Sequence, residues 1–240
     1  MVDIHNHLLY GVDDGSVSIE DSIKVLKDME MSGYTDIILT PHYINDSRYS
    51  NPRSDNLKRL EILKEEVKKN KISINLFLGN EIYIDDNISE LLDKDIVSSL
   101  NNTNYLLFEL PMNGDYSGYQ EIFKYFLSKG YKVVLAHPER YISFQEDFNK
   151  IYELDEMGVY FQGNIDSLVG KYGPQAERMI IRLLKENKLS FLATDIHHKK
   201  HNYSKWIEAK NKALKYVSLD VYDTLTRINP SLLVEGDIYE

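Results

Sequence analysis

The chain has no cysteine among its 240 residues, and it has only six prolines and one tryptophan. The absence of cysteine excludes disulfides, thiolate zinc sites and any mechanism that uses a cysteine nucleophile. An excess of basic residues is also missing, because 28 Lys and Arg stand against 38 Asp and Glu, a formal net charge of −10. This balance argues against binding of nucleic acid through a broad basic surface.

Long apolar runs are absent as well. No uninterrupted run approaches the roughly 20 residues that a membrane-spanning helix needs, so we expect no direct insertion into a membrane. The N-terminal segment MVDIHNHLLYGVDDG lacks a basic region followed by an apolar one, and therefore does not resemble a secretory signal. A cytoplasmic location is the expectation that follows.

Glycine-rich nucleotide-binding motifs are missing too. No Gly-x-Gly-x-x-Gly follows any predicted strand, and Gly170-Lys171-Tyr172 has neither the interval nor the Ser or Thr of a phosphate-binding loop. We find no internal repeat, no low-complexity segment and no linker rich in Pro, Gly or Ser. The sequence therefore predicts one domain over residues 1–240.

Seven short β-rich runs recur along the chain, and most are continuous apolar runs typical of strands buried on both faces of a parallel sheet. They span residues 2–7, 36–42, 75–84, 105–110, 132–137, 159–165 and 189–197. Helical patterns lie between them, beginning with a capping-box-like pair, Ser18 and Asp21, and a stop at Gly33. Seven strand–helix units predict a closed or nearly closed α/β barrel, with an open doubly wound sheet as the alternative.

Polar residues gather at the carboxyl ends of these predicted strands. The set contains five histidines and three acids: His5, His7, His42, Glu81, Glu109, His137, Asp195 and His197. In a parallel barrel these strand ends form one face, where catalytic residues lie. A single histidine at such a place is more often a structural hydrogen-bonding group, but eight such residues from six strands favour a common site.

The residue types in this set indicate bound metal. Several carboxylates close together raise one another's pKa unless cations neutralise them, and His5 and His7 point to the same side of a strand. Imidazole and carboxylate donors without thiolate suit Mn²⁺, Fe or Zn²⁺ better than Ca²⁺ or Mg²⁺. Glu81 and Glu109 could each bridge ions, so we expect two or three, which would polarise a phosphoryl oxygen and activate water.

Six motifs carry a resemblance to a known family. DIHNHLLYGVDDG, TPH, GNEIY, FELP, AHPER and ATDIH, in this order from residue 3 to 197, resemble the polymerase-and-histidinol-phosphatase (PHP) superfamily. Within it, the chain is most similar to bacterial manganese-dependent tyrosine-protein phosphatases of capsule and exopolysaccharide gene clusters. The resemblance implies a distorted seven-stranded (β/α) barrel with its metal site at the C-terminal ends of the strands.

The same resemblance implies a set of metal ligands for an Mn²⁺-favouring site. The first ion would be held by His5, His7, Glu81 and Asp195, and the second by Glu81, Glu109 and His137. The third would be held by Asp14, His42 and His197. Asp13 and His198 are adjacent alternatives for two of these positions.

Phosphate binding is assigned by resemblance to Arg140, whose guanidinium fork matches phosphate geometry. The structural alternative is a salt bridge with Glu139 or a neighbouring acid. A second phosphate-binding arginine would be expected after the last histidine, where this chain has Lys199, Lys200 and His201 instead. These residues either supply a point charge or form a solvated loop.

The resemblance implies a hydrolase that removes phosphate from protein phosphotyrosine, with His42 or His197 assisting proton transfer. Its substrate would be the tyrosine-rich tail of a partner bacterial tyrosine kinase that controls polysaccharide synthesis. Tyr10, Tyr43, Tyr83 and Tyr141 could flank an open mouth. A small-molecule phosphatase such as a histidinol phosphatase, and a non-catalytic metal-binding scaffold, are the alternatives. Residues 228–240 predict a helix and a tail that could serve homo-oligomerisation.

Overall fold

The computed structural model describes residues 1–114, 116–197 and 203–235, and its strands form two parallel sheets. The first sheet has the order β1 (Val2–Asp3), β2 (Asp36–Leu39), β4 (Asn75–Leu78). The second has the order β3 (His42–Tyr43), β5 (Glu81–Tyr83), β6 (Tyr105–Glu109), β7 (Lys132–Ala136), β8 (Tyr160–Asn164), β9 (Phe191–Ala193). The predicted α/β class with parallel strands is confirmed.

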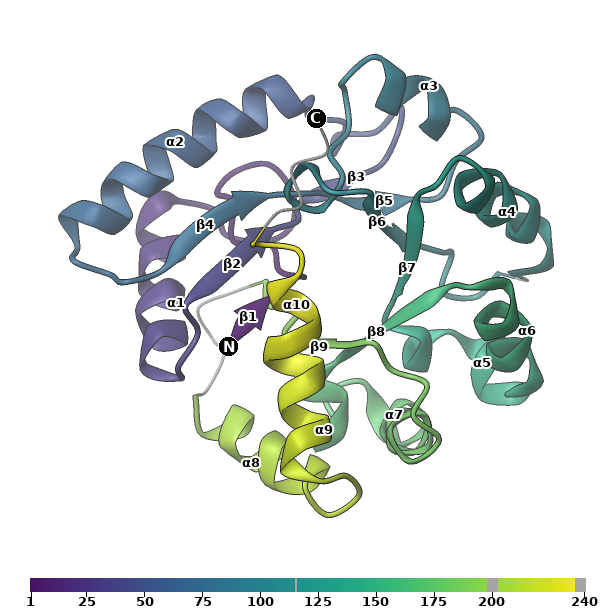
Figure 1. The fold of residues 1–240 in the computed structure, drawn as a ribbon. Helices are drawn as coiled ribbons and strands as arrows, with labels where there is room; N and C mark the ends of the chain where they lie inside the picture. The colour runs from purple at the N-terminus through teal and green to yellow at the C-terminus, as the bar shows by residue number, and fades with distance from the viewer. Residues whose placement is uncertain (115, 198–202, 236–240) are drawn as a thin grey trace.

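The two sheets are joined at both ends. At one end the chain runs directly from β2 of the first sheet into β3 of the second, and from β4 into β5. At the other end Asn6 and Ile196 form an isolated parallel bridge. Figure 1 shows the strands arranged around a common centre, with most helices outside them. Strand ends that are distant in the sequence therefore lie on one side of the molecule.

Helices lie between most of the strands and after the last one. They are α1 (Ile19–Met31), α2 (Arg53–Lys69), α3 (Ile88–Asp93), α4 (Gln120–Ser128), α5 (Ile142–Glu146), α6 (Asn149–Met157), α7 (Gly173–Lys185), α8 (Tyr203–Ala213), α9 (Leu219–Asp223) and α10 (Asn229–Ser231). Helix α1 begins as the sequence predicts, because the Asp21 N–H donates to the Ser18 hydroxyl at 3.3 Å. No helix in the described part of the chain is long and apolar enough to cross a membrane.

Two predicted strands are each divided in the structure. Residues 36–42 separate into β2 and β3, because Pro41 has no N–H to donate to a strand ladder. Residues 75–84 separate into β4 and β5 around Gly79, where a Cβ would lie 2.9 Å from a Leu100 methyl carbon. The described strands consequently number nine, not seven, although they occupy the predicted positions.

The C-terminal part of the chain differs most from prediction. Helices α8 and α9 have no counterpart in the prediction. The last helical segment of the chain, expected from residue 228, begins at Leu219. Lys199, Lys200 and His201, the end of the predicted tail and its Tyr239 lie outside the described residues. Leu233 is buried in a cluster with Val2 and Phe191, at the amino-terminal ends of the strands. Helix α10 thus covers the end of the strand arrangement opposite the carboxyl ends (Figure 1).

Candidate metal centre

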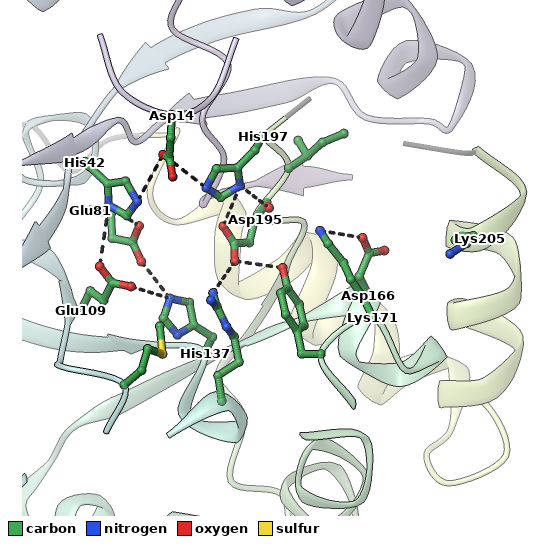
Figure 2. Close-up of a pocket in the computed structure, with 14 residues that line it drawn as sticks. Asp14, His42, Glu81, Glu109, His137, Asp166, Lys171, Asp195, His197 and Lys205 are labelled. Carbon is green, nitrogen blue, oxygen red and sulfur yellow. Dashed lines mark hydrogen bonds and ion pairs between the residues drawn. The ribbon is translucent and has the colours of Figure 1, made fainter. Parts of the chain in front are cut away.

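A pocket of about 610 Å³ lies at the carboxyl ends of the strands. The nine residues proposed as metal ligands all lie in or beneath it, and Figure 2 labels those that line it. They are His5, His7, Asp14, His42, Glu81, Glu109, His137, Asp195 and His197. The structure therefore brings together every predicted ligand, from segments up to 192 residues apart (His5 to His197).

Glu81, the first residue of β5, occupies the centre of this cluster. Its Oε1 lies 3.2 Å from His5 Nε2 and 3.0 Å from His137 Nε2. Its Oε2 lies 3.3 Å from His7 Nε2 and 3.0 Å from His42 Nδ1. Burial alone would raise the pKa of Glu81, but the surrounding imidazoles hold it well below its ordinary value. One carboxylate thus faces four imidazoles, as a bridging ligand would.

Asp195 lies just beyond β9, and its two carboxylate oxygens have different contacts. Oδ2 accepts hydrogen bonds from Asn164 Nδ2 at 2.6 Å, Arg140 Nη1 at 3.0 Å and the Tyr172 hydroxyl at 3.2 Å. Oδ1 faces the interior of the cluster, 3.4 Å from His7 Nε2. Three donors on one oxygen fix the carboxylate, so that the other oxygen is held toward the centre.

Two residues of the cluster have left-handed backbone conformations. His137 has φ 35° and Asp195 has φ 48°, values that are uncommon for residues with a Cβ. Such strain is found preferentially where side chains must be held in functional positions. In both cases the turn at the end of a strand directs the side chain into the cluster.

Hydrogen bonds outside the cluster set the orientation of two imidazoles. His5 Nδ1 lies 2.6 Å from Gln162 Oε1, and His7 Nδ1 lies 2.7 Å from Asp13 Oδ2. When Nδ1 donates to such an acceptor, the lone pair of Nε2 is directed toward a ligand site. In both residues Nε2 faces Glu81. A carboxylate–histidine pair of this kind is typical of metal ligands.

The two aspartates of the DDG turn, Asp13 and Asp14, lie in different surroundings. Asp13 is directed inward, where it also accepts from the backbone N–H of His42 at 2.9 Å. Asp14 is half-exposed at the mouth, 3.6 Å from His42 Nε2 and 3.7 Å from His197 Nε2. At Gly15 a Cβ would lie 2.0 Å from the His7 carbonyl oxygen, so only glycine permits this close packing.

The residues present suit a divalent metal. Nε2 of His5, Nε2 of His7 and Nδ1 of His42 are buried and have no hydrogen-bond partner among the described residues. Burial and the nearby Glu81 carboxylate raise the pKa of Glu109 to about 8, which reflects the cost of packing acids together without cations. Bound cations would give the three buried nitrogens a partner and would neutralise the packed carboxylates. Nitrogen and oxygen donors of this kind match Mn²⁺, Fe or Zn²⁺.

Arg140 lies beside the cluster, as its predicted role requires. Its ion-pair partner is Asp195, the neighbouring-acid alternative, rather than Glu139, and its guanidinium carbon lies 4.5 Å from the centre of the Tyr172 ring. Glu139 instead accepts from the Ser167 hydroxyl at 2.6 Å. A guanidinium has five N–H donors, so this arrangement leaves donors for a phosphoryl group.

Sequence reasoning missed several residues that support the site. Gln162 and Asn164 alternate on the predicted strand 159–165, so two amides on one face of that strand were a usable signal; both are buried in the structure. Tyr172 lies in the turn directly before α7, and no motif or spacing in the sequence indicated a role for it. The expected tyrosine flanks are partly wrong, because Tyr43 and Tyr141 are buried in the hydrophobic core.

Fold and site together define a parallel α/β protein with a histidine–carboxylate centre of the type used by metal-dependent hydrolases. The family model for capsular polysaccharide synthesis, CpsB/CapC, matches residues 1–235, and the chain belongs to this family. The tyrosine-protein phosphatase YwqE of Bacillus subtilis is 34% identical over 200 residues, which cover 83% of this chain and 78% of that protein.

Solved structures agree with this assignment. A crystal structure from work on the metal-dependent tyrosine phosphatases YwqE of Bacillus subtilis and CpsB of Streptococcus pneumoniae superposes with a TM-score of 0.89. Its identity is 31%, with 98% of this chain and 94% of that chain covered. Histidinol phosphate phosphatase of Lactococcus lactis, 16% identical with a TM-score of 0.59 and coverage of 90% and 93%, shares the fold. The resemblance inferred from the motifs is confirmed.

Proposed function

We propose that this protein, a metal-dependent tyrosine-protein phosphatase, acts on the phosphotyrosine-bearing tail of a partner bacterial tyrosine kinase and thereby regulates capsule or exopolysaccharide synthesis. The observation that carries the proposal is the position of Arg140 at the edge of the histidine–carboxylate cluster, in one pocket. The family's link to capsular polysaccharide synthesis and the tyrosine phosphatase activity of its relatives support it.

We assign the metal ligands as the sequence motifs imply. His5, His7, Glu81 and Asp195 would hold one ion, and Glu81, Glu109 and His137 a second; Asp14, His42 and His197 would hold a third. Mn²⁺ is the proposed metal, with Fe or Zn²⁺ compatible with the same donors. Bound ions would neutralise phosphoryl oxygens and make hydroxide available from water at neutral pH.

The chain's own residues bind and orient the substrate. Arg140, fixed by Asp195 and by the Tyr172 ring, presents its free N–H groups to the phosphoryl oxygens. It stabilises the charge that these oxygens carry during attack. His42 and His197 lie at the mouth next to Asp14, where either could pass a proton to the leaving phenolate if it is not held as a ligand.

We further propose that the fold works as one domain, a distorted seven-stranded barrel. In this description β2 with β3, and β4 with β5, each count as one interrupted strand. The chain continuity from β2 into β3 and from β4 into β5 supports it at one end, and the hydrogen bond from the His7 N–H to the Ile196 carbonyl supports it at the other. A cytoplasmic location would place the pocket beside the kinase tail.

The proposal is tested with metal-stripped protein assayed before and after addition of Mn²⁺. The substrates are a phosphotyrosine peptide, the same peptide with phosphoserine, and histidinol phosphate. We expect Mn²⁺-dependent phosphate release from the phosphotyrosine peptide alone. A preference for histidinol phosphate would move the function to small-molecule metabolism. Metal binding without turnover of any substrate would favour the non-catalytic scaffold.

A further inference from the structure

The pocket extends beyond the residues that surround the proposed metal site. Lys171 and Lys205 line it together with Asp166. Figure 2 shows these three residues on one side of Asp195, and Glu81 and Glu109 on the other. The phosphoryl-binding part of the pocket therefore continues into a part with lysine side chains.

The volume of the pocket exceeds what a phosphotyrosine side chain needs. A cavity of about 150 Å³ accommodates a benzene ring, so a ring with its phosphoryl group requires roughly 300 Å³. The pocket measures about 610 Å³. About half of it is thus available for groups of the substrate next to the phosphotyrosine.

Lys171 is held in place on this side of the pocket. Its Nζ lies 3.2 Å from Oδ2 of Asp166, whose side chain is buried, and 5.0 Å from the centre of the Tyr172 ring. An ammonium group has three N–H donors. One contact with Asp166 therefore fixes the lysine and leaves donors for a second anion, at a smaller entropic cost than a freely moving lysine would incur.

Lys205 reaches the same part of the pocket from a different element. It is in the first turn of α8, which packs against the 3-10 turn Ile165–Val169 that contains Asp166. Among the described residues of this part of the pocket, two ammonium groups and the Asp166 carboxylate leave one net positive charge. A single carboxylate on the substrate complements that charge.

We propose that Lys171 and Lys205 form a second anion subsite, which binds the carboxylate of an aspartate or glutamate flanking the phosphotyrosine. Arg140 Cζ and Lys171 Nζ lie 4.5 Å and 5.0 Å from the centre of the same Tyr172 ring, so the two charged groups are close together. Because two extended residues span about 7 Å, the acidic residue should lie within about two positions of the phosphotyrosine. The inference rests on the proposed function and deepens it, since it names acidic phosphotyrosine segments as the preferred substrates.

The test compares kcat/KM for three peptides that differ only at the two positions on each side of the phosphotyrosine, which carry alanine, glutamate or lysine. The Mn²⁺-loaded protein is compared with its Lys171→Gln/Lys205→Gln variant and with Lys64→Gln, an exposed lysine of α2 that serves as control. We expect the wild type to prefer the glutamate peptide over the alanine peptide about fivefold at low salt, and less at high salt.

The double variant should lose this preference and Lys64→Gln should keep it. The Lys205→Glu variant should shift preference toward the lysine peptide, which a merely destabilised protein would not do. Equal kcat/KM for the glutamate and alanine peptides in the wild type, or a preference that survives in the double variant, overturns the subsite. Failure to hydrolyse even the alanine peptide overturns the proposed function itself, and the two failures are thereby distinguished.

Discussion

Single side chains in this site are each held by more than one neighbour. Asp195 receives three hydrogen bonds on one oxygen, and His7 is bonded on one ring nitrogen to Asp13 while the other faces Glu81. This arrangement separates residues that would bind metal from residues that orient them. Substitutions can therefore affect metal affinity and substrate binding separately.

Arg140→Ala should separate these two properties. Loss of the guanidinium removes phosphoryl-binding donors, so we expect kcat/KM for a phosphotyrosine peptide to fall about 100-fold. Metal content should stay near the wild-type value, because Asn164 and Tyr172 still hold Oδ2 of Asp195 when the guanidinium is lost. Steady-state kinetics and elemental analysis of the same preparation provide the measurement. Arg140→Lys keeps the positive charge but cannot bind two oxygens at once, so its kcat/KM should lie between those of the wild type and Arg140→Ala. Unchanged kinetics in Arg140→Ala would contradict the phosphate-binding role.

Asp13→Asn should weaken metal binding although Asp13 is not a proposed ligand. Its carboxylate holds Nδ1 of His7 at 2.7 Å, and loss of such a partner costs about 10- to 100-fold in metal affinity. Titration with Mn²⁺ followed by calorimetry measures the change. Asp86→Asn, at an exposed position, is the matched control. An affinity equal to that of the wild type would show that Asp13 does not position His7.

Whole elements contribute to the site through their ends. Strands β5, β6 and β7 each carry a cluster residue at or next to a terminus, and the loop between β1 and α1 folds back over His7. Apolar runs buried on both faces made the strand positions predictable from the sequence. The interruption at Pro41 follows from proline's missing N–H and was readable from the sequence. The interruption at Gly79 and the short helices were not predictable, because they depend on contacts with other elements.

Gly15→Ala should destabilise the loop between β1 and α1. A Cβ there would lie 2.0 Å from the His7 carbonyl oxygen, so the backbone must move, at a cost of about 1–3 kcal/mol in the free energy of unfolding. Thermal unfolding of the metal-free protein gives the comparison. Gly118→Ala is the control, because a Cβ there meets nothing within 4 Å. Equal melting temperatures for the two variants would argue against tight packing at Gly15.

The whole molecule concentrates acidic groups and imidazoles in one buried cluster on an acidic chain. Charges of like sign held together oppose folding, and cations that bind only the folded state offset this. The proposed metal is thus expected to act on stability as well as on catalysis. The segments that meet at the cluster include both the beginning of the chain and residue 197.

Metal removal should lower the melting temperature of the protein. At Mn²⁺ concentrations about 100 times Kd, binding adds about 2.7 kcal/mol to the free energy of unfolding. Scanning calorimetry with excess EDTA and with excess Mn²⁺ should show this increase. Glu81→Gln, which removes the central carboxylate charge, should show a much smaller difference between the two conditions. An identical melting temperature with and without Mn²⁺ in the wild type would contradict metal binding at this site.

The sequence by itself determined which residues could form the cluster. Histidines and acids at the ends of buried strands must converge when parallel strands form a common sheet edge, so eight of the nine proposed ligand positions followed from the residues alone. Asp14 and Arg140 were added by the resemblance to the PHP superfamily. Only the tertiary structure decided which nitrogen of each imidazole faces Glu81, that Arg140 contacts Asp195 and Tyr172, and that Lys171 and Lys205 line the same pocket. Local spacing fixes the face of a strand, but contacts between distant segments depend on how the elements pack.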